Sequence, residues 1–245
     1  MGKKRKKIGI MGGTFDPIHV GHLILGEQAY EQLGLDEVWF MPSGNPPHKK
    51  EREGRATDRE RVSMVRRAIS GNPHFSLSLL EMEKDGYTYT YHTLETLKRE
   101  QPDTDYYFII GADSLFNLHT WKNPERICQC CIMVVASRNH ASAEKLLEEM
   151  KKASQLYQGE FLLLETMNVD VSSQELRTWI QEGKSIRYYV PDPVILLKKR
   201  GFTKDGKIRF HKNGEKACKV SGRKQICPYT WSHVYLRVSR NGSRV

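Results

Sequence analysis

Short apolar runs alternate with amphipathic segments along residues 7–200. Continuous apolar runs are typical of strands buried on both faces, whereas apolar positions three and four residues apart are typical of helices. The predicted strands are KIGIM (7–11), EVWFMPS (37–43), the alternating FSLSLLEME (75–83), DYYFIIGAD (105–113), CIMVVAS (131–137) and EFLLLE (160–165). The predicted helices are 17–33, a helix from Thr57 with Val62, Val65 and Ile69 on one face and Thr57 or Asp58 as its cap, YTYHTLETLKRE (89–100), 141–153 and SSQELRTWIQEG (172–183).

This alternation predicts an α/β fold with a doubly wound parallel sheet, whose ligands bind beyond the carboxyl ends of the strands. The pattern ends at PDPVILLKKRG (191–201), so we expect a basic segment 1–7, one domain over 8–200 and an extension over 201–245. The extension has 11 of the 39 Lys and Arg residues but only 2 of the 29 Asp and Glu residues. It therefore carries +9 of the net charge of +10, and without a sustained period we expect it to be poorly ordered.

The first strand is followed by GGTFDPIHVGH (12–22). Asp16-Pro17 is a good helix start, because Asp can cap and Pro is tolerated at the first helical position. His19 and His22 would then share one face of an exposed helix start, where free N–H groups already favour an anion. A tight turn beside two structural histidines is the alternative, but the glycine pair at a strand end favours a phosphate site.

Several further segments carry a family resemblance. GGTFDPIHVGH resembles the G-x-F-x-P-x-H-x-G-H signature of the nucleotidylyltransferase superfamily. MPSGNPPHK (41–49), TYTYHTL (88–94), IGADS (110–114), VASR (135–138), VSSQELR (171–177) and SIRYYVPDPV (185–194) resemble bacterial nicotinate-nucleotide adenylyltransferases, in order and over roughly residues 7–200. The resemblance implies a Rossmann-like fold and transfer of an adenylyl group from ATP to nicotinate mononucleotide, which gives deamido-NAD and pyrophosphate.

The resemblance also implies how ATP is held. His19 and His22 would be catalytic donors to its phosphates, without a covalent enzyme intermediate. Ser172 and Ser173 begin a capping box, and the free N–H groups there would hold the β- and γ-phosphates together with Arg177. Mg²⁺ is expected with ATP, held mainly by phosphates and water, and no protein metal site is predicted. The residues expected to bind ATP are Gly12, Gly13, Thr14, Phe15, Gly111, Asp113, Arg138, Ser172, Ser173 and Arg177.

The mononucleotide would lie over the loop SGNPPHKK (43–50). Trp121 is the predicted stacking partner of the nicotinate ring, and the helix start at Tyr89 and Thr90 would donate to its carboxylate. The residues expected to bind the mononucleotide are Asn45, His48, Lys49, Tyr89, Thr90 and Trp121. The chain departs from the family pattern at His92, where Asp is common, and at Gln174, where Thr is usual.

Two other functions remain as alternatives. An adenylyltransferase of the pantetheine-phosphate type would share the first signature, but SGNPPHK argues against it. A nucleic-acid-binding protein would account for the pI of about 9.3. Its basic residues would have to form a patch on the folded body, whereas here they lie in the terminal segments, so no specific nucleic-acid partner is expected. A homo-oligomer is left open.

The remaining features of the sequence indicate a cytoplasmic protein. No stretch approaches the roughly 20 apolar residues that span a bilayer, and the apolar run after the basic N-terminus is too short for a secretory signal. The five cysteines include Cys128, Cys130 and Cys131, which lead into the run IMVVA. We expect reduced thiols buried in a strand there, not a disulfide framework or a metal site.

Overall fold

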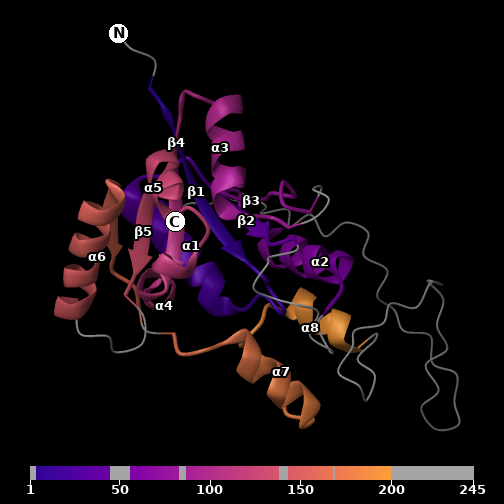
Figure 1. Cartoon of the computed structure of the whole chain (residues 1–245). Helices are drawn as coiled ribbons and strands as arrows, with labels where there is room; N and C mark the ends of the chain where they lie inside the picture. The colour runs from indigo at the N-terminus through magenta and orange to yellow at the C-terminus, as the bar shows by residue number, and fades with distance from the viewer. Residues whose placement is uncertain (1–3, 45–55, 83–86, 138–142, 168, 200–245) are drawn as a thin grey trace, which may run out of the picture. The chain divides into compact units, whose positions relative to one another are not determined.

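The structure, a computed structural model, describes residues 4–44, 56–82, 87–137, 143–167 and 169–199, with the backbone alone over 196–199. Six strands form one sheet in the order β3-β2-β1-β4-β5-β6 (Figure 1). Each neighbouring pair runs parallel, as the sequence predicts. The strands are β1 (Lys6–Gly13), β2 (Glu37–Pro42), β3 (Phe75–Leu77), β4 (Thr104–Gly111), β5 (Ile132–Ala136) and β6 (Phe161–Leu164).

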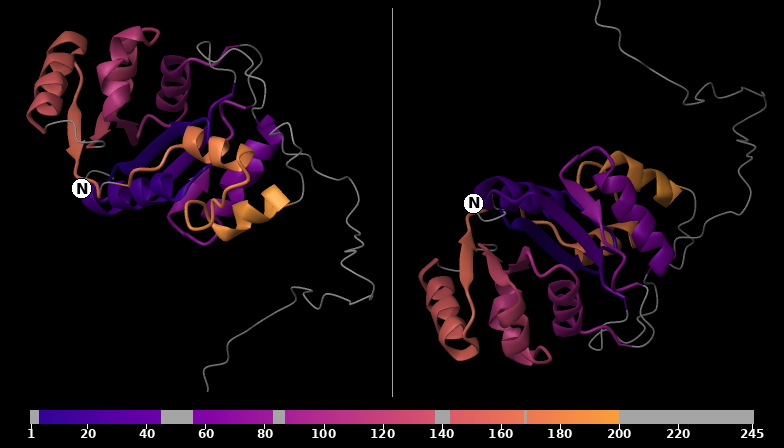
Figure 2. Two further views of the ribbon diagram at one scale, coloured as in Figure 1. Left: turned by 90° about the horizontal axis from the view of Figure 1, so that it is seen from below. Right: turned by 90° about the horizontal axis from the view of Figure 1, so that it is seen from above.

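Helices cover both faces of this sheet, with one hydrophobic core on each face (Figure 2). Successive residues of β4 show the alternation, since Tyr107 and Ile109 belong to one core while Phe108 and Ile110 belong to the other. The first core also takes in α1 (Val20–Leu33), α2 (Asp58–Ile69), α7 (Ser173–Gln181) and α8 (Asp192–Lys199). The second takes in α3 (Thr90–Glu100), α4 (Ala112–Phe116), α5 (Pro124–Cys130) and α6 (Ala143–Tyr157), with the short 3-10 turn η1 (Leu118–Thr120) after α4.

The strand order reverses direction between β1 and β4. The chain first builds outward from β1 through β2 to β3, and then returns to place β4 on the other side of β1. Loops leaving β1 and β4 therefore diverge to opposite faces, which opens a crevice at the carboxyl ends of these strands. This position is the expected binding edge of the sheet.

Local signals account for two of the helix starts. Thr57 caps α2 through a capping box with Glu60, and Ser172 caps α7 in the same way with Glu175. The capping box at Ser172 is confirmed, and of the two predicted cap candidates of α2, Thr57 and Asp58, Thr57 is the N-cap. At the other end of a helix, Gly34 terminates α1 in the left-handed region with φ of 56°, a conformation that glycine adopts at low cost.

Four sequence expectations are corrected by the structure. Helix α1 begins at Val20 with His19 at the N-cap, not at Pro17, and the Asp16–Pro17 peptide bond is cis. Strand β3 has only three residues, so most of FSLSLLEME is not a strand. Asp113 lies in the first turn of α4 instead of at a strand end. Cys128 and Cys130 belong to α5, so these thiols precede the strand and are not part of it. Among the described residues, no helix has the length and apolarity needed to cross a membrane.

Candidate active site

A cavity of about 370 Å³ opens at the carboxyl ends of β1, β2 and β4. Its size falls within the range of small-molecule sites. Two of its walls come from the glycine-containing ends of β1 and β4. The other lining residues come from the end of β2, the segment after β3, α1, α3, α4 and the segment after η1. The residues that line it include Gly12, Gly13, Thr14, His22, Met41, Ser43, Glu81, Thr90, Phe108, Gly111, Asp113, Ser114 and Trp121.

The two histidines lie together at the start of α1. Their rings stack with centroids 3.7 Å apart, which confirms that they share one face. His22 lines the cavity, and its Nδ1 accepts a hydrogen bond from the backbone N–H of His19 at 3.3 Å. Because Nδ1 accepts, the proton of neutral His22 is on Nε2, which leaves this atom as a donor. His19 is only 2% exposed, so the expectation that both histidines lie at an exposed helix start is wrong for His19.

Phe15 also belongs to this corner, although it does not line the cavity. It is 2% exposed and belongs to the hydrophobic core, so its ring does not face a ligand, and a contact of Phe15 with ATP stays a prediction. Its ring meets the ring of His22 edge to face at 5.1 Å. A Cβ added at Gly13 would approach the Phe15 ring to 3.1 Å, so glycine at this position gives the close packing that the turn needs.

The N-terminus of α7 contacts the residues that lead into α1. The hydroxyl of Ser173 donates to the carbonyl of Pro17 at 2.9 Å, and Arg177 Nη1 donates to the carbonyl of Asp16 at 2.6 Å. Ser172 accepts from the backbone of Glu175 at 3.2 Å as the cap. These contacts bring residues of α7 beside the turn that precedes α1 and ends at His19, which we call the histidine turn. The two segments are more than 150 positions apart in the sequence. Neither the two serines nor Arg177 lines the cavity itself.

On the β4 side, Gly111 and Asp113 both line the cavity. Gly111 is the N-cap of α4, and Asp113 is the second residue of that helix and is exposed. The predicted ATP residues Gly12, Gly13, Thr14, Gly111 and Asp113 are therefore brought together. Arg138 lies outside the described residues.

Two residues predicted for the mononucleotide line the same cavity, namely Thr90 and Trp121. Trp121 is half-buried and meets Phe108 at right angles, with ring centroids 6.2 Å apart. Tyr89 is the N-cap of α3 and packs beside Tyr91, but it does not line the cavity. Asn45, His48 and Lys49 lie outside the described residues.

The two departures from the family pattern lie away from the cavity wall. His92 is 60% exposed on α3, where its ring stacks on Tyr91 at 4.2 Å and its Nδ1 lies 4.0 Å from a carboxylate oxygen of Glu95. Gln174 is exposed in the first turn of α7. Neither substitution therefore changes the surface that the substrates would meet in the described part of the site.

Sequence reasoning missed Glu81, which lines the cavity. The residue falls in the segment expected to be a strand, where an acid would be read as a solvated position. Instead the chain turns there, and Glu81 Oε1 accepts a hydrogen bond from the hydroxyl of Thr93 at 3.2 Å. A Cβ at Gly44 would overlap the carbonyl oxygen of Glu81, which shows how closely the two segments approach. No local signal in the sequence could have found this contact.

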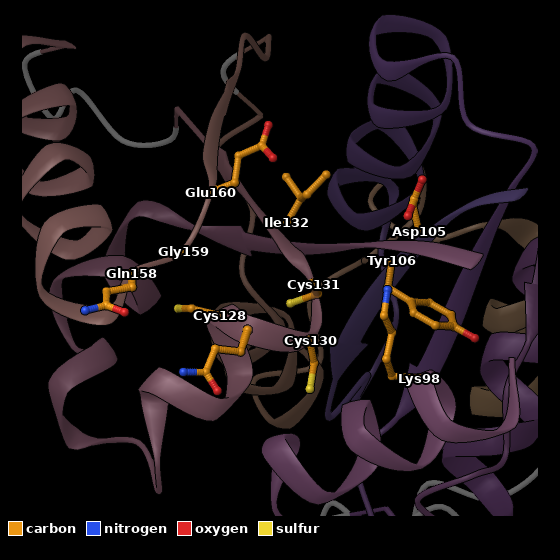
Figure 3. A pocket seen from close by; sticks show the side chains of 11 residues that line it. Lys98, Asp105, Tyr106, Cys128, Cys130, Cys131, Ile132, Gln158, Gly159 and Glu160 are labelled. Atoms are coloured by element: carbon orange, nitrogen blue, oxygen red, sulfur yellow. The ribbon is translucent and has the colours of Figure 1, made fainter. Parts of the chain in front are cut away.

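A second cavity of about 460 Å³ lies at the opposite edge of the sheet, near the starts of β4 and β5. Figure 3 shows Cys128, Cys130 and Cys131 on its wall between Gly159 and Tyr106. Burial, with a smaller contribution from Glu125, raises the pKa of Cys128 to about 12, and burial raises that of Cys131 well above its usual value. These thiols are neutral at pH 7 and are poor nucleophiles and metal ligands. The described residues contain no group of three or more potential metal ligands.

Comparisons with known proteins agree with this arrangement. Residues 10–179 match the family described as cytidylyltransferase-like. A Lachnoclostridium phytofermentans protein named "probable nicotinate-nucleotide adenylyltransferase" is 43% identical over 198 residues, which cover 80% of this chain and 98% of that protein. A Rubrobacter xylanophilus protein of the same name is 40% identical, over 82% of this chain and 94% of its own length.

The fold also matches a solved structure. The Plasmodium falciparum nicotinic acid mononucleotide adenylyltransferase in complex with NaAD superposes with a TM-score of 0.65 at 22% identity, over 79% of this chain and 95% of that one. At this identity the likeness concerns the fold. The sequence matches cover most of both chains at about 40% identity, and they show the narrower relationship. This chain belongs to the nicotinate-nucleotide adenylyltransferase family.

Proposed function

We propose that this protein transfers the adenylyl group of ATP to nicotinate mononucleotide, giving deamido-NAD and pyrophosphate. The observation that carries the proposal is that His22 and Trp121 line one cavity, at the carboxyl ends of β1 and β4. A triphosphate at the histidine turn and a flat ring on the indole can therefore occupy the same site. Family membership and the NaAD in the P. falciparum structure support this assignment.

The reaction needs positioning more than covalent chemistry. A phosphate oxygen of the mononucleotide attacks the α-phosphorus of ATP in line, the bond to the bridging oxygen breaks, and pyrophosphate leaves. Catalysis then consists of holding two anions together and stabilising the charge that develops on the phosphate oxygens. His22 can donate from Nε2 to those oxygens. His19 stacks on it from the buried side and keeps its ring in place.

The leaving pyrophosphate would lie toward α7. This helix presents free N–H groups at its start, and its dipole favours an anion there. Arg177 uses Nη1 on the Asp16 carbonyl, and its guanidinium has further N–H donors for a phosphate. We therefore assign Ser172, Ser173 and Arg177 to the β- and γ-phosphates, beyond the edge of the described cavity.

Mg²⁺ is the cation that we expect with ATP, and the cavity suits it. Among the described residues, the acidic ones on its wall are Asp113 and Glu81, fewer than an all-protein metal site needs. Such a donor set fits an ion held by one carboxylate, substrate phosphates and water, and Asp113 is the residue that would hold it. When bound, the ion would neutralise charge on the triphosphate.

On the mononucleotide side, the nicotinate ring would stack on Trp121, and the start of α3 at Tyr89 and Thr90 would donate to its carboxylate. Glu81 is an acceptor and would repel that carboxylate. We place it instead on the ribose, whose hydroxyl groups pair well with an acidic side chain. Its hydrogen bond from Thr93 holds the carboxylate in one orientation for this contact.

A pyrophosphate-release assay tests the proposed function. The full-length protein is incubated with ATP, Mg²⁺ and, in separate reactions, nicotinate mononucleotide, nicotinamide mononucleotide and 4′-phosphopantetheine. We expect the highest kcat/KM with nicotinate mononucleotide and formation of deamido-NAD by mass spectrometry. Equal turnover of the nicotinamide compound would refute the specificity, and turnover of phosphopantetheine alone would refute the family-based substrate.

A further inference from the structure

Arg61 on α2 is a buried charge outside the cavity wall. Its side chain has no exposed surface. Nη1 donates to the carbonyl of Thr14 at 3.0 Å, and Nη2 donates to the carboxylate of Asp58 at 2.5 Å. Nη2 also lies 4.0 Å from the sulfur of Met82. The guanidinium thus connects α2 to the turn that follows β1.

Stability alone gives a poor account of this residue. Burying a guanidinium is costly, and an apolar side chain of similar size is often as good or better for folding. Asp58, the carboxylate partner, is 67% exposed and compensates the charge only in part. Nε has no hydrogen-bond partner among the described residues. Of its two hydrogen bonds, the one with Thr14 reaches a residue of the cavity wall.

Thr14 lines the cavity and is followed by a residue in an uncommon conformation. Phe15 has φ of 50°, in the left-handed region that aromatic residues rarely adopt. Such a conformation persists where surrounding contacts determine it. The carbonyl of Thr14 and the N–H of Phe15 belong to one planar peptide and point in opposite directions. By holding the carbonyl toward α2, Arg61 turns the Phe15 N–H away from α2.

The neighbouring carbonyls of this turn are held from outside in the same manner. Each accepts a hydrogen bond from an element beyond the turn, which fixes the orientation of its peptide unit. The pairs are Ser43 N with Gly13 O at 2.7 Å, Arg61 Nη1 with Thr14 O at 3.0 Å, Arg177 Nη1 with Asp16 O at 2.6 Å and Ser173 Oγ with Pro17 O at 2.9 Å. Arg61 supplies the contact next to Phe15, whose ring packs on His22 at 5.1 Å.

We propose that Arg61 is a positioning residue for adenylyl transfer, which holds the Thr14–Phe15 peptide and, through the Phe15 ring, the imidazole of His22 in the geometry that the triphosphate needs. The inference rests on the proposed function for the identity of the reaction. The inference concerns ATP and not the mononucleotide. The contacts that connect Arg61 to His22 run through Thr14 and Phe15, which follow β1, where we place the triphosphate.

The test compares Arg61→Met with Arg66→Met, a matched loss of charge at an exposed position of the same helix. We expect Arg61→Met to lower kcat about 10- to 100-fold, since a displacement of about 1 Å can cost on the order of 100-fold. The Kd of ATP, measured by calorimetry without the second substrate, should rise in the same variant. The KM of the mononucleotide should stay within about twofold, and Arg66→Met should behave as the wild type.

Arg61→Lys keeps the charge and one donor, and should give a kcat between those of the wild type and Arg61→Met at an unchanged melting temperature. A folded Arg61→Met variant with wild-type kcat and ATP affinity would overturn the proposal. So would an unfolded Met variant beside a Lys variant with wild-type kcat, because the role of Arg61 would then be stability alone. Wild-type protein that lacks turnover would instead reject the proposed function, and the ATP titration would still decide the role of Arg61.

Discussion

His22 combines two roles that conservative substitutions can separate. Its Nδ1 accepts a hydrogen bond from the backbone N–H of His19, so the proton of the neutral ring is on Nε2, which is the atom that would donate toward a phosphate. In His22→Asn the side-chain amide ends near the position of Nδ1, so the contact to His19 can be kept while the outer donor is lost. In His22→Gln the amide reaches about as far as Nε2, so the outer donor is kept while the contact to His19 is lost.

The structure sets the size of each effect. Removing one donor from developing transition-state charge typically lowers kcat by about 10²–10³-fold, which we expect for His22→Ala and His22→Asn. The hydrogen bond to His19 contributes roughly 1 kcal/mol to folding, and each ring contact roughly 0.5–1.5 kcal/mol. His22→Ala loses the hydrogen bond and the contacts with His19 and Phe15. These losses amount to roughly 2–4 kcal/mol, so its melting temperature should fall by roughly 4–16 °C, at about 2–4 °C per kcal/mol.

The assay combines steady-state pyrophosphate release with thermal melts of the three variants. We expect the order of kcat to be wild type, Gln, then Asn and Ala together. We expect Asn to retain more thermal stability than Ala. His22→Asn with a kcat equal to or above that of His22→Gln would refute the donor role of Nε2, and near-normal kcat in His22→Ala would remove His22 from the reaction altogether.

Two further predictions concern the ring site and the buried thiols. Trp121→Ala should raise the KM of the mononucleotide by roughly 5- to 150-fold, since stacking contributes about 1–3 kcal/mol per base. The KM of ATP should stay nearly unchanged. A larger change in the KM of ATP than in that of the mononucleotide would place the indole at the adenine. Burial raises the pKa of Cys128 from 9.0 to about 12, so between these pH values the unfolded chain loses the thiol proton while the folded protein keeps it. The free energy of unfolding should therefore fall as the pH rises from 9 toward 12. The loss is at most about 1.4 kcal/mol per pH unit for each buried thiol. Urea unfolding from pH 8 to pH 10.5 should show a smaller loss in a Cys128→Ala, Cys131→Ala double variant, and parallel slopes in the two proteins would contradict this.

The sheet was predictable because its signals are local. Strands buried on both faces need continuous apolar runs, and IMVVA in β5 is such a run. The capping boxes at Thr57 and Ser172 likewise involve residues three positions apart. The start of α1 was misplaced because contacts distant in sequence determine it. Ser173 and Arg177 hold the carbonyls of Pro17 and Asp16, and the helix begins only after this turn.

The candidate site was visible in part for the same reason. Glycines, histidines and a tryptophan near strand ends were recognisable by type and position. Most of those predicted line one cavity together with Thr14, Asp113 and Thr90, and His19 stacks on His22 beside it. Arg61 was not recognisable, because the face of α2 expected to be buried runs through Val62, Val65 and Ile69, where an adjacent arginine would be solvated. The structure buries Val65 and Ile69 as predicted, but Arg61 and Met64 are buried as well, whereas Val62 is half-buried. The residue that Arg61 contacts in the interior, Thr14, lies 47 positions away in the sequence.

Glu81 shows how a failed strand prediction and the site are connected. The segment FSLSLLEME alternates as a strand should, yet β3 pairs only from Phe75 to Leu77 against Val38 to Phe40. Strand β2 ends at Pro42, which has no N–H to donate, so the ladder has no partner to extend along. The chain turns away instead, and the turn places Glu81 against Gly44 and into the cavity. Local preference is overridden here by a contact that brings an acid to the proposed ribose position, and departures of this kind are expected where a sequence serves a site as well as a fold.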